Sequence, residues 1–248
     1  MTVGVLVVTG GSRGIGAAVV RRAAETGWSV CLSYRAEQAA ADALAEELCD
    51  LGVAACAVRA DMSVEADIVG LFAAAAELGP LAGLVANAGV VAQQRRVDEI
   101  DAARVRHLLE VNVTAPILCC REAVRHMSTR HGGQGGSIVL ISSVASRLGS
   151  PGEYVDYAAT KGAVDTLGVG LAKEVARESI RVNIVRPGII DTEFHASGGD
   201  ADRAARLGPS LPLGRPGTAD EVAEAVVWLL SEQASYCTGT ILDVAGGR

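Results

Sequence analysis

The sequence predicts an α/β protein of one domain, in which a doubly wound parallel sheet lies between two layers of helices. Two observations support this prediction. Short apolar segments rich in Val, Ile and Leu recur along the 248 residues, and segments with a helical pattern separate them. No Pro/Ser-rich linker or internal repeat interrupts this alternation, which is typical of a parallel sheet covered on both faces.

The first half of the chain contains four predicted strands and three predicted helices. The strands are the apolar, Val- and Ala-rich segments 3–10, 29–34, 53–60 and 81–89. The helices are the segments 15–26, 36–52 and 63–78. Each of these helices ends at a glycine or directly before one, as helices commonly do.

The second half continues the alternation with longer helices. Its predicted strands are 137–143, 180–188 and 240–247, and its predicted helices are roughly 98–130, 155–178 and 218–231. The last helix opens with Thr218 and Glu221, which form the T-x-x-E pattern of a capping box. Segment 191–216 is too long for a simple connection, so we expect a substrate lid there, with a disordered excursion as the alternative.

Composition argues against several classes of protein. Hydrophobic residues make up 50% of the chain and aromatic residues 3%, so the core must be built from Ala, Val, Leu and Ile. The formal charge of −7 and the lack of a basic stripe argue against a nucleic-acid partner. No apolar run approaches the ~20 residues of a membrane span, and residues 1–11 lack the charged start of a signal peptide. We therefore expect no membrane partner and a cytoplasmic location.

Cysteine and histidine show no metal-binding pattern. The six cysteines lack C-x-x-C spacing, so we interpret them as small hydrophobic side chains in a reducing compartment. They are Cys31, Cys49, Cys56, Cys119, Cys120 and Cys237. The histidines are scattered at His107, His126, His131 and His195. No metal site is expected.

A glycine-rich turn, TGGSRGIG, spans residues 9–16 between the first predicted strand and the first predicted helix. Gly10, Gly14 and Gly16 allow a tight turn, a close approach to a pyrophosphate, and close packing of the helix. The free N–H groups and positive dipole end of the helix would bind the phosphates. The context predicts a Rossmann-type dinucleotide site, although Val19 takes the final glycine position of a literal G-x-G-x-x-G motif.

The T-G-x-x-x-G-x-G pattern, together with the motifs below, closely resembles the short-chain dehydrogenase/reductase family over essentially the whole chain. The chain is similar to both beta-ketoacyl-carrier-protein reductases and glucose 1-dehydrogenases of the single-domain branch. The resemblance implies that the turn binds the cofactor through Gly10, Ser12, Arg13, Gly14, Ile15 and Gly16. It implies further cofactor contacts from Asp61, Met62, Asn87, Ala88, Gly89, Pro187, Gly188, Ile190 and Thr192. Asp61 would bind the adenine, with a helix cap as its alternative role.

The end of the second predicted strand should decide the choice of cofactor. An acidic side chain there binds the adenosine ribose of NAD, whereas a cation pairs with the 2′-phosphate of NADP. Tyr34 stands where NAD-preferring relatives carry Asp, and Arg35 follows it. Arg13 supplies a second cation, while Glu37 is evidence for NAD unless it lies in the first turn of the next helix. NADP(H) is therefore favoured, and NAD(H) stays open.

The stretch YVDYAATK, residues 154–161, contains two tyrosines and one lysine. Residues four apart share a helical face, so Lys161 would stabilise the phenolate of Tyr157 and lower its pKa from about 10. Such a phenol serves as general acid for a carbonyl under hydride attack, and as base for an alcohol in the reverse direction. Tyr154 lies two helical turns from Lys161, about 10 Å of rise, so we assign it to the pocket wall or to packing.

The predicted strand 137–143 ends in Ser142 and Ser143, and the resemblance implies that one of them binds the substrate oxygen. Ser143 matches the family position better, although its separation from the catalytic tyrosine is about one residue longer than is common, so Ser142 stays open. The resemblance also implies that Lys161 binds the nicotinamide ribose. The backbone of Asn112 would hold a water that links Lys161 to solvent. The alternative for Asn112 is an ordinary helix residue bonded to a neighbouring carbonyl.

Together these residues predict an NADP(H)-dependent oxidoreductase that transfers a hydride between the nicotinamide and a small carbonyl or alcohol substrate. The alternatives are a non-catalytic NADP-binding sensor and an NAD(P)-dependent sugar or alcohol dehydrogenase. Substrate identity should depend on residues 144–156 and 191–216. Four apolar residues hint that an uncharged group is accommodated, and they are Leu148, Ile190, Leu207 and Leu211. The resemblance implies a homotetramer.

Overall fold

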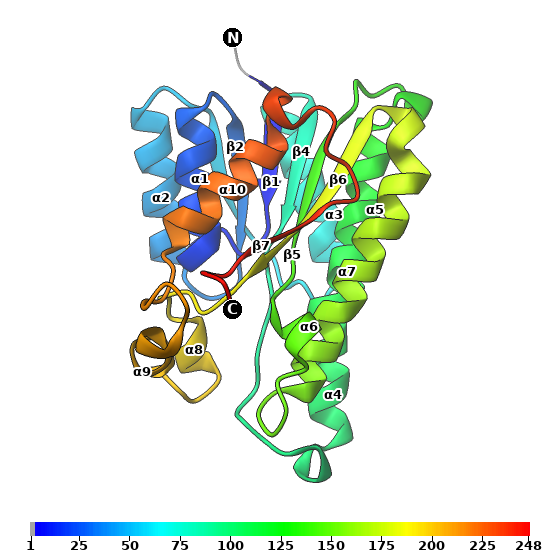
Figure 1. Cartoon of the computed structure of the whole chain (residues 1–248). Coiled ribbons are helices and arrows are strands. Elements are labelled where there is room, and N and C mark those ends of the chain that lie inside the picture. The colour runs from blue at the N-terminus through cyan, green and yellow to red at the C-terminus, as the bar shows by residue number, and fades with distance from the viewer. Residues whose placement is uncertain (1–2) are drawn as a thin grey trace.

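The seven strands described by the computed structural model, which covers residues 3–248, form one parallel sheet in the order β3-β2-β1-β4-β5-β6-β7 (Figure 1). They are β1 (Val5–Val8), β2 (Ser29–Tyr34), β3 (Ala55–Arg59), β4 (Leu81–Ala86), β5 (Gly136–Ile141), β6 (Ile180–Pro187) and β7 (Ile241–Val244). Each coincides with a predicted strand to within a few residues at its ends, so the predicted fold class is confirmed. The strand order reverses between β1 and β4, and sheets of this kind bind ligands at the carboxyl ends of such strands.

Helices cover both faces of the sheet in two layers (Figure 1). One layer contains α1 (Gly14–Glu25), α2 (Gln38–Asp50) and α10 (Ala219–Leu230), and the other contains α3 (Glu65–Leu78), α5 (Ala115–Met127) and α7 (Val155–Val175). Leu6 and Val8 of β1 enter the apolar cluster beneath the α1 layer. Val5 and Val7 of the same strand enter the cluster beneath the α3 layer. The sheet is therefore buried on both faces, which explains why its strands are apolar throughout.

Shorter helices and turns occupy the connections. They are α4 (Ala102–Leu109), α6 (Ala145–Leu148), α8 (Phe194–Ser197) and α9 (Arg203–Leu207), with η1 (Val97–Glu99), η3 (Thr129–His131), η4 (Ala176–Glu178), η5 (Gly208–Ser210) and η6 (Glu232–Ala234). The predicted helix 98–130 is divided, because a π-helical turn, η2 (Glu110–Thr114), separates α4 from α5. The residues that flank η2 keep right-handed helical dihedral angles, so helical periodicity continues through the turn and does not mark it.

The capping box predicted at the start of α10 is confirmed. The hydroxyl of Thr218 accepts a hydrogen bond from the N–H of Glu221 at 3.2 Å, and the Glu221 carboxylate accepts one from the N–H of Thr218 at 2.8 Å. These bonds satisfy N–H groups that the first helical turn leaves free. Within residues 3–248, no helix combines the length and the apolar character of a membrane span.

Residues 191–216, which we call the α8–α9 segment, fold over the carboxyl ends of the strands (Figure 1). The two ends of the segment are joined, because the N–H of Asp191 donates to the carbonyl of Gly217 at 2.9 Å and the N–H of Gly217 donates to that of Ile189 at 2.9 Å. Ile189, Ala204 and Leu211 form a small apolar cluster under it. The segment is therefore folded, and the alternative of a disordered excursion is wrong.

The packing of α7 against β6 depends on Gly168. A Cβ atom on this glycine would lie 2.4 Å from Cγ1 of Ile184. We predict that Gly168→Ala lowers the free energy of unfolding by about 1–3 kcal/mol, because the core has no space for the added methyl group. The measurement is urea unfolding.

The matched control is Gly70→Ala on an exposed position of α3, where a Cβ atom would meet nothing within 4 Å. Alanine at this helical position should stabilise the protein by up to about 1 kcal/mol. Equal effects of the two substitutions would contradict the proposed steric cause.

Candidate active site

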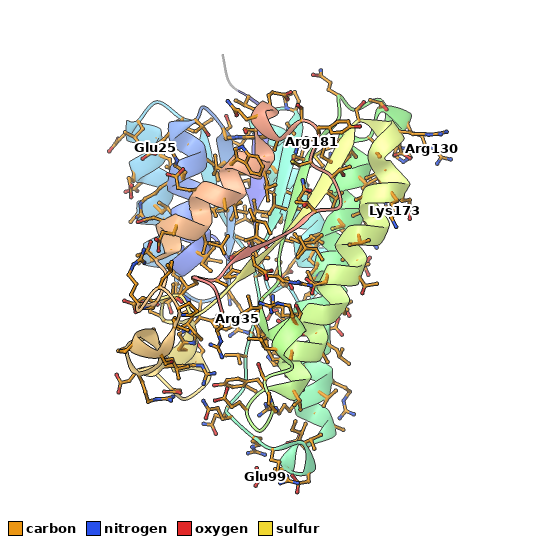
Figure 2. The ribbon with its side chains drawn as sticks, in the orientation of Figure 1. Glu25, Arg35, Glu99, Arg130, Lys173 and Arg181 are labelled. Carbon is orange, nitrogen blue, oxygen red and sulfur yellow. The ribbon has the colours of Figure 1, made fainter. Side chains whose placement is uncertain are left out.

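A cleft of about 410 Å³ opens at the carboxyl ends of the strands, beside the α8–α9 segment. Figure 2 shows Arg35 at this end of the molecule, with Glu25 and Arg181 at the opposite end. Every residue predicted to bind the cofactor lines the cleft: Gly10, Ser12, Arg13, Gly14, Ile15, Gly16, Tyr34, Arg35, Asp61, Met62, Asn87, Ala88, Gly89, Tyr157, Lys161, Pro187, Gly188, Ile190 and Thr192. Ser143 also lines it, whereas Asn112 lies behind its wall.

The glycine turn has no space for larger side chains. A Cβ atom on Gly16 would lie 2.1 Å from the carbonyl oxygen of Gly10, whose φ is +63°. Asn87 fastens this turn to β4, because its side-chain amide donates to the carbonyl oxygens of Thr9 and Gly10 at 2.9 and 3.0 Å. The Thr9 hydroxyl accepts hydrogen bonds from the N–H groups of Asn87 and Ala88, both at 3.0 Å. Thr9 is thus a supporting residue that the motif search did not select.

The N-terminus of α1 is available to bind an anion. Arg13 occupies the N-cap position, and among the described residues no side chain caps this end and no acid lies in its first turn. The residues of this turn line the cleft, and their N–H groups and the positive end of the helix dipole attract phosphate. The glycine turn brings the backbone close enough for such contact. The site therefore fits the pyrophosphate of a dinucleotide.

Charged side chains gather at the ends of β2 and β3. Tyr34 is 7% exposed at the last position of β2, and Arg35 is exposed directly after it. Glu37 is the N-cap residue of α2, one position before the first turn in which it was expected, and it also lines the cleft. Asp61 accepts hydrogen bonds from the hydroxyl and N–H of Ser63 at 2.7 and 2.9 Å, which lower its pKa. Asp61 thus braces the turn before α3 and also lines the cleft.

Desolvation controls the acidity of Tyr157. The residue is partly exposed to the cleft, and its ring lies 6.0 Å from the ring of Phe194 in α8. Burial of the phenol raises the pKa of Tyr157 to about 12, and a hydrogen-bonding interaction with Ser143 acts in the opposite direction. The expectation that Lys161 lowers this pKa is therefore corrected. The cost of placing a phenolate among protein atoms is the largest influence on this pKa and gives it its upward direction.

Lys161 lies beside Tyr157 and binds the main chain. Its Nζ donates a hydrogen bond to the carbonyl of Ile141 at 2.8 Å and lies 5.7 Å from the centre of the Tyr157 ring. The residue is 4% exposed. Burial lowers the pKa of Lys161 to about 8, although Asp165 one turn farther along α7 acts in the opposite direction. The ammonium therefore titrates close to neutral pH.

The two serines after β5 have different surroundings. The hydroxyl of Ser142 is buried and donates to the carbonyl oxygen of Lys161 at 3.1 Å. The Ser143 hydroxyl accepts a hydrogen bond from the N–H of Ala145 at 3.1 Å and interacts with the phenol of Tyr157. Of the two serines, Ser143 is therefore the one that faces the candidate acid/base.

Asn112 is fully buried within the π-helical turn η2. Its Oδ1 accepts from the N–H of Val90 at 2.8 Å, and its Nδ2 donates to the Val90 carbonyl at 2.9 Å and to the Thr160 hydroxyl at 3.2 Å. A Cβ atom on Gly89 would lie 3.4 Å from both Oδ1 of Asn112 and Nζ of Lys161, so the two side chains flank Gly89. Asn112 thus joins η2 to α7 and to a wall of the cleft, and its bond to the Val90 carbonyl is of the kind that the alternative role expects.

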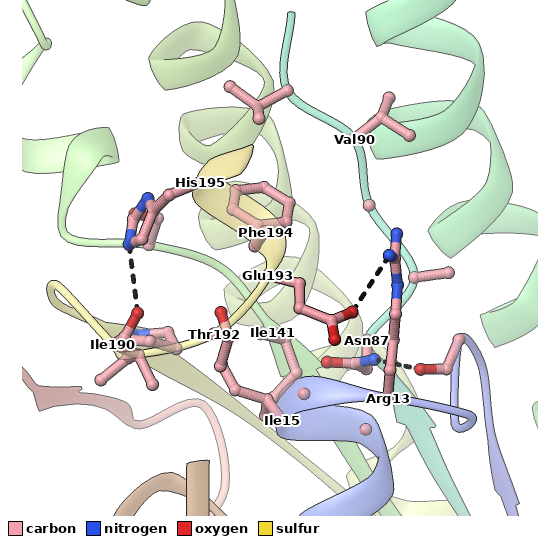
Figure 3. Close-up of a pocket in the computed structure, with 18 of the residues that line it drawn as sticks. Arg13, Ile15, Asn87, Val90, Ile141, Ile190, Thr192, Glu193, Phe194 and His195 are labelled. Carbon is pink, nitrogen blue, oxygen red and sulfur yellow. Dashed lines mark hydrogen bonds and ion pairs between the residues drawn. The ribbon is translucent and has the colours of Figure 1, made fainter. Parts of the chain in front are cut away.

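The α8–α9 segment adds lining residues that sequence reasoning did not select. They are Glu193, Phe194, His195 and Arg203. Arg13 reaches across to this segment, with its Nη1 3.4 Å from Oε2 of Glu193 (Figure 3). Nε2 of His195 lies 3.1 Å from the carbonyl oxygen of Ile190, and burial lowers the pKa of His195 (Figure 3). Phe194 and His195 lie in α8 and Arg203 lies in α9, helices of four and five residues that are too short for a periodic pattern to mark them.

The apolar residues expected near the substrate divide into two groups. Leu148 and Ile190 line the cleft. Leu211 and Leu207 instead pack against Ile189 inside the α8–α9 segment, so their expected contact with substrate is corrected. Across residues 3–248, no group of three His, Cys, Asp or Glu side chains is arranged to bind a metal ion.

Comparison with known proteins extends over nearly the whole chain. A family model described as enoyl-(acyl carrier protein) reductase matches residues 10–248. An uncharacterized oxidoreductase of Escherichia coli, YgfF, is 51% identical over 245 residues, which are 98% of this chain and 99% of that protein. The chain belongs to the short-chain dehydrogenase/reductase family. It is therefore an oxidoreductase that acts on CH–OH and C=O groups.

Two solved structures that share the fold each contain a nicotinamide cofactor, NADPH in one and NADH in the other. A blue fluorescent protein from a metagenomic library, in complex with NADPH, is 33% identical with a TM-score of 0.91, covering 99% of this chain and 98% of that chain. A 3-ketoacyl-(acyl-carrier-protein) reductase from Brucella melitensis, complexed with NADH, is 32% identical with a TM-score of 0.91, covering 100% and 98%. The family relationship therefore supports a nicotinamide dinucleotide in the cleft.

Burial of Lys161 should reduce the stability of the protein. Its pKa in the folded protein, about 8, lies below the ordinary value of 10.5, so the unfolded chain binds the proton more tightly. We predict that Lys161→Met raises the free energy of unfolding at pH 7 by up to about 3 kcal/mol. The gain should shrink as pH rises from about 8 to 10.5, because lysine becomes neutral in both states. Urea unfolding across this range measures the difference, and a gain that does not change with pH would contradict the cause.

Proposed function

We propose that this protein transfers a hydride between NADP(H) and a small carbonyl or alcohol substrate, with Tyr157 as the general acid/base. The observation that carries the proposal is the meeting of Tyr157, Ser143 and Lys161 in the cleft that the glycine turn also lines. When bound there, the cofactor supplies or accepts the hydride. The residues of the chain then have to bind the substrate oxygen and donate a proton to it or accept one from it.

In carbonyl reduction, the Ser143 hydroxyl positions the substrate oxygen and Tyr157 donates the proton that this oxygen gains. A pKa of about 12 keeps the phenol protonated at neutral pH, which is the form that reduction requires. Lys161, held by the carbonyl of Ile141, places positive charge beside the phenol as its proton leaves. Asn112 and the same lysine flank Gly89, and Asn112 belongs to the route that replaces the proton. In alcohol oxidation, Tyr157 takes the proton instead.

The preference for NADP(H) is supported by the side chains at the ends of β2 and α1. Tyr34 and Arg35 occupy the positions where an NAD-specific site would present a carboxylate. Arg13 now pairs with Glu193, but both side chains are more than half exposed, at 53% and 75%. Exposed pairs of this kind are weak, so Arg13 can turn to a phosphate dianion. Glu37 lines the same end of the cleft and explains why NAD(H) is retained as the second choice.

Two further properties belong to this proposal. The α8–α9 segment acts as a substrate lid, which is supported by the position of Phe194 beside the ring of Tyr157.

The protein assembles as a homotetramer, as the family resemblance implies. Ile117 of α5 and Trp228 of α10 support this assembly, because they are apolar side chains 45% and 44% exposed on helices of opposite layers.

The acid/base assignment predicts a specific loss of turnover. Tyr157→Phe should lower kcat/KM by about 10²–10⁴-fold, because the proton donor is removed while the ring remains. NADPH binding should persist. The measurement is NADPH absorbance with a panel of ketones and aldehydes. Tyr154→Phe is the matched control and should keep kcat.

The same panel separates the enzyme from the alternative of a sensor. Turnover by the wild-type protein that is lost in Tyr157→Phe supports the proposal. Tight NADPH binding by the wild-type protein with no turnover on any compound would favour a non-catalytic sensor.

The cofactor assignment predicts that Arg35→Ala shifts preference toward NADH. KM for NADPH should rise roughly tenfold, because a charge-assisted hydrogen bond to the 2′-phosphate is removed, and KM for NADH should change little. Arg21→Ala provides the control, since Arg21 is an exposed cation of α1 that pairs with Glu47 and does not line the cleft. An unchanged ratio of the two KM values in Arg35→Ala would contradict the role of Arg35.

A further inference from the structure

The start of α7 requires support from outside its own loop. The loop before it contains three positions with positive φ, which are Gly149, Ser150 and Gly152. A Cβ atom on either glycine would meet nothing within 4 Å, so neither packs closely against the protein. Tyr154 occupies the N-cap position of α7, and among the described residues no side chain caps this end. The carbonyl of Ser150 in this loop accepts hydrogen bonds from the N–H groups of Glu153 and Tyr154 at 3.3 and 3.1 Å, which hold the N-cap but not the turn that carries Tyr157.

Arg104 of α4 binds this first turn. Its Nε and Nη2 donate to the two carboxylate oxygens of Asp156 at 2.6 and 3.1 Å, and both side chains are only 8% exposed. Oδ1 of Asp156 also accepts from the N–H of Tyr157 at 2.9 Å. Nη1 of Arg104 donates to the carbonyl of Gln93. Burial is the largest single influence and acts to raise the pKa of Asp156, but the hydrogen bonds from Arg104 and from the N–H of Tyr157, together with the charge of Arg104, outweigh it. The net pKa is lowered, so the pair is ionic.

Arg203 of α9 binds the residues just before this turn. Its Nη1 and Nη2 donate to the two carboxylate oxygens of Glu153 at 3.1 and 2.5 Å, and Nη1 lies 3.6 Å from Asp200. The guanidinium lies 5.3 Å from the centre of the Tyr154 ring. The Arg203 side chain is 6% exposed, and both Arg203 and Tyr154 line the cleft. This second interaction thus joins the α8–α9 segment to a wall of the cleft.

We propose that these two buried arginines are positioning residues for different steps of the reaction. Arg104 holds Asp156, which binds the main chain of Tyr157, so Arg104 sets the direction of the phenol and thereby kcat. Arg203 holds the Tyr154 wall and the α8–α9 segment, so it sets substrate binding and thereby KM. Neither arginine takes part in proton transfer. This inference rests on the acid/base role proposed above for Tyr157.

The division follows from what each ion pair holds in place. Displacement of Asp156 moves the amide of the next residue, Tyr157, and an error of about 1 Å in a reacting group can cost 10²-fold in rate. Displacement of the Tyr154 side chain changes the shape of the pocket, whereas the carbonyl of Tyr154 can keep the hydrogen bond that it accepts from the N–H of Ala158 in α7 at 2.9 Å. A wall that fits the substrate less closely weakens ground-state and transition-state binding alike, which raises KM and leaves kcat unchanged.

The kinetic test compares Arg104→Met with Arg203→Met. Arg104→Met should lower kcat roughly tenfold to a hundredfold with KM within about threefold of wild type. Arg203→Met should raise KM for the carbonyl substrate roughly tenfold with kcat within about threefold. Arg21→Gln removes an exposed pair with Glu47 outside the cleft and should change neither parameter. Parallel changes of kcat and KM in both Met variants would overturn the proposal.

A second variant separates positioning from stability. Loss of Arg104 alone leaves Asp156 as an unpaired buried charge, which strongly destabilises a protein. Arg104→Met/Asp156→Leu removes both charges and should recover much of the lost thermal stability. Its kcat should stay low, because the bond to the main chain of Tyr157 is still missing. A wild-type kcat in this double variant would overturn the role of Arg104.

Hydrogen exchange of the full-length protein provides a readout that does not need turnover. Arg104→Met should speed exchange in peptides over 155–160 and leave 194–207 close to wild type, and Arg203→Met should do the reverse. If the wild-type protein turns over no substrate, the proposed function fails, and this exchange pattern alone decides whether the two arginines act separately. The same exchange change in both variants would overturn that separation.

Discussion

The hydrogen bonds by which Asn87 holds the glycine turn against the end of β4 fix the geometry of the whole cleft. Asn87 binds the carbonyl groups of Thr9 and Gly10, and the Thr9 hydroxyl binds the backbone of Asn87 in return. β1 and β4 are the two strands between which the order of the sheet reverses. Because α1 begins in the glycine turn, the same bonds also aim the positive end of α1 into the cleft.

Burial then gives the site its chemical character. The ordinary pKa values of Tyr157 and Lys161, 10.0 and 10.5, become about 12 and about 8, so desolvation drives both groups toward their neutral forms. The phenol is thereby kept as a proton donor. With a pKa of about 8, Lys161 responds readily to its surroundings. Hydrogen-bond acceptors brought close to its Nζ would favour the charged ammonium, and this charge would make the loss of the Tyr157 proton easier. The burial of Lys161 destabilises the fold. The same burial strengthens the interaction of its charge with nearby groups, because charges interact more strongly where water is excluded.

Sequence reasoning found the residues that directly follow strands, and the structure explains why. Carboxyl ends of parallel strands meet at one edge, so motif residues such as Asn87 and Ser143 had to converge there. It could not find Arg104 and Asp156 as partners, because the two lie 52 positions apart on helices whose packing sets their distance. It also missed the π-helical turn at Asn112, since the bonds that hold this side chain come from distant segments. The local sequence pattern thus predicts the helices, the strands and the residues at the carboxyl edge of the sheet. Which side chains pair between distant elements depends on how the folded chain packs.

The family resemblance implies that the loop between Ser143 and Tyr157 is about one residue longer than is common, yet a hydrogen-bonding interaction of Ser143 still acts on the phenol of Tyr157. The sheet sets the place of Ser143, because the N–H of the preceding Ser142 donates to the carbonyl of Val185 in β6 at 2.8 Å. Helix α7 sets the place of Tyr157. The connection between these two rigid elements turns through residues 149–152, where positive φ angles fold the chain tightly. Ser143 is thus placed by the sheet and Tyr157 by α7, while the connection between them contributes Leu148, Ser150 and Tyr154 to the wall of the cleft.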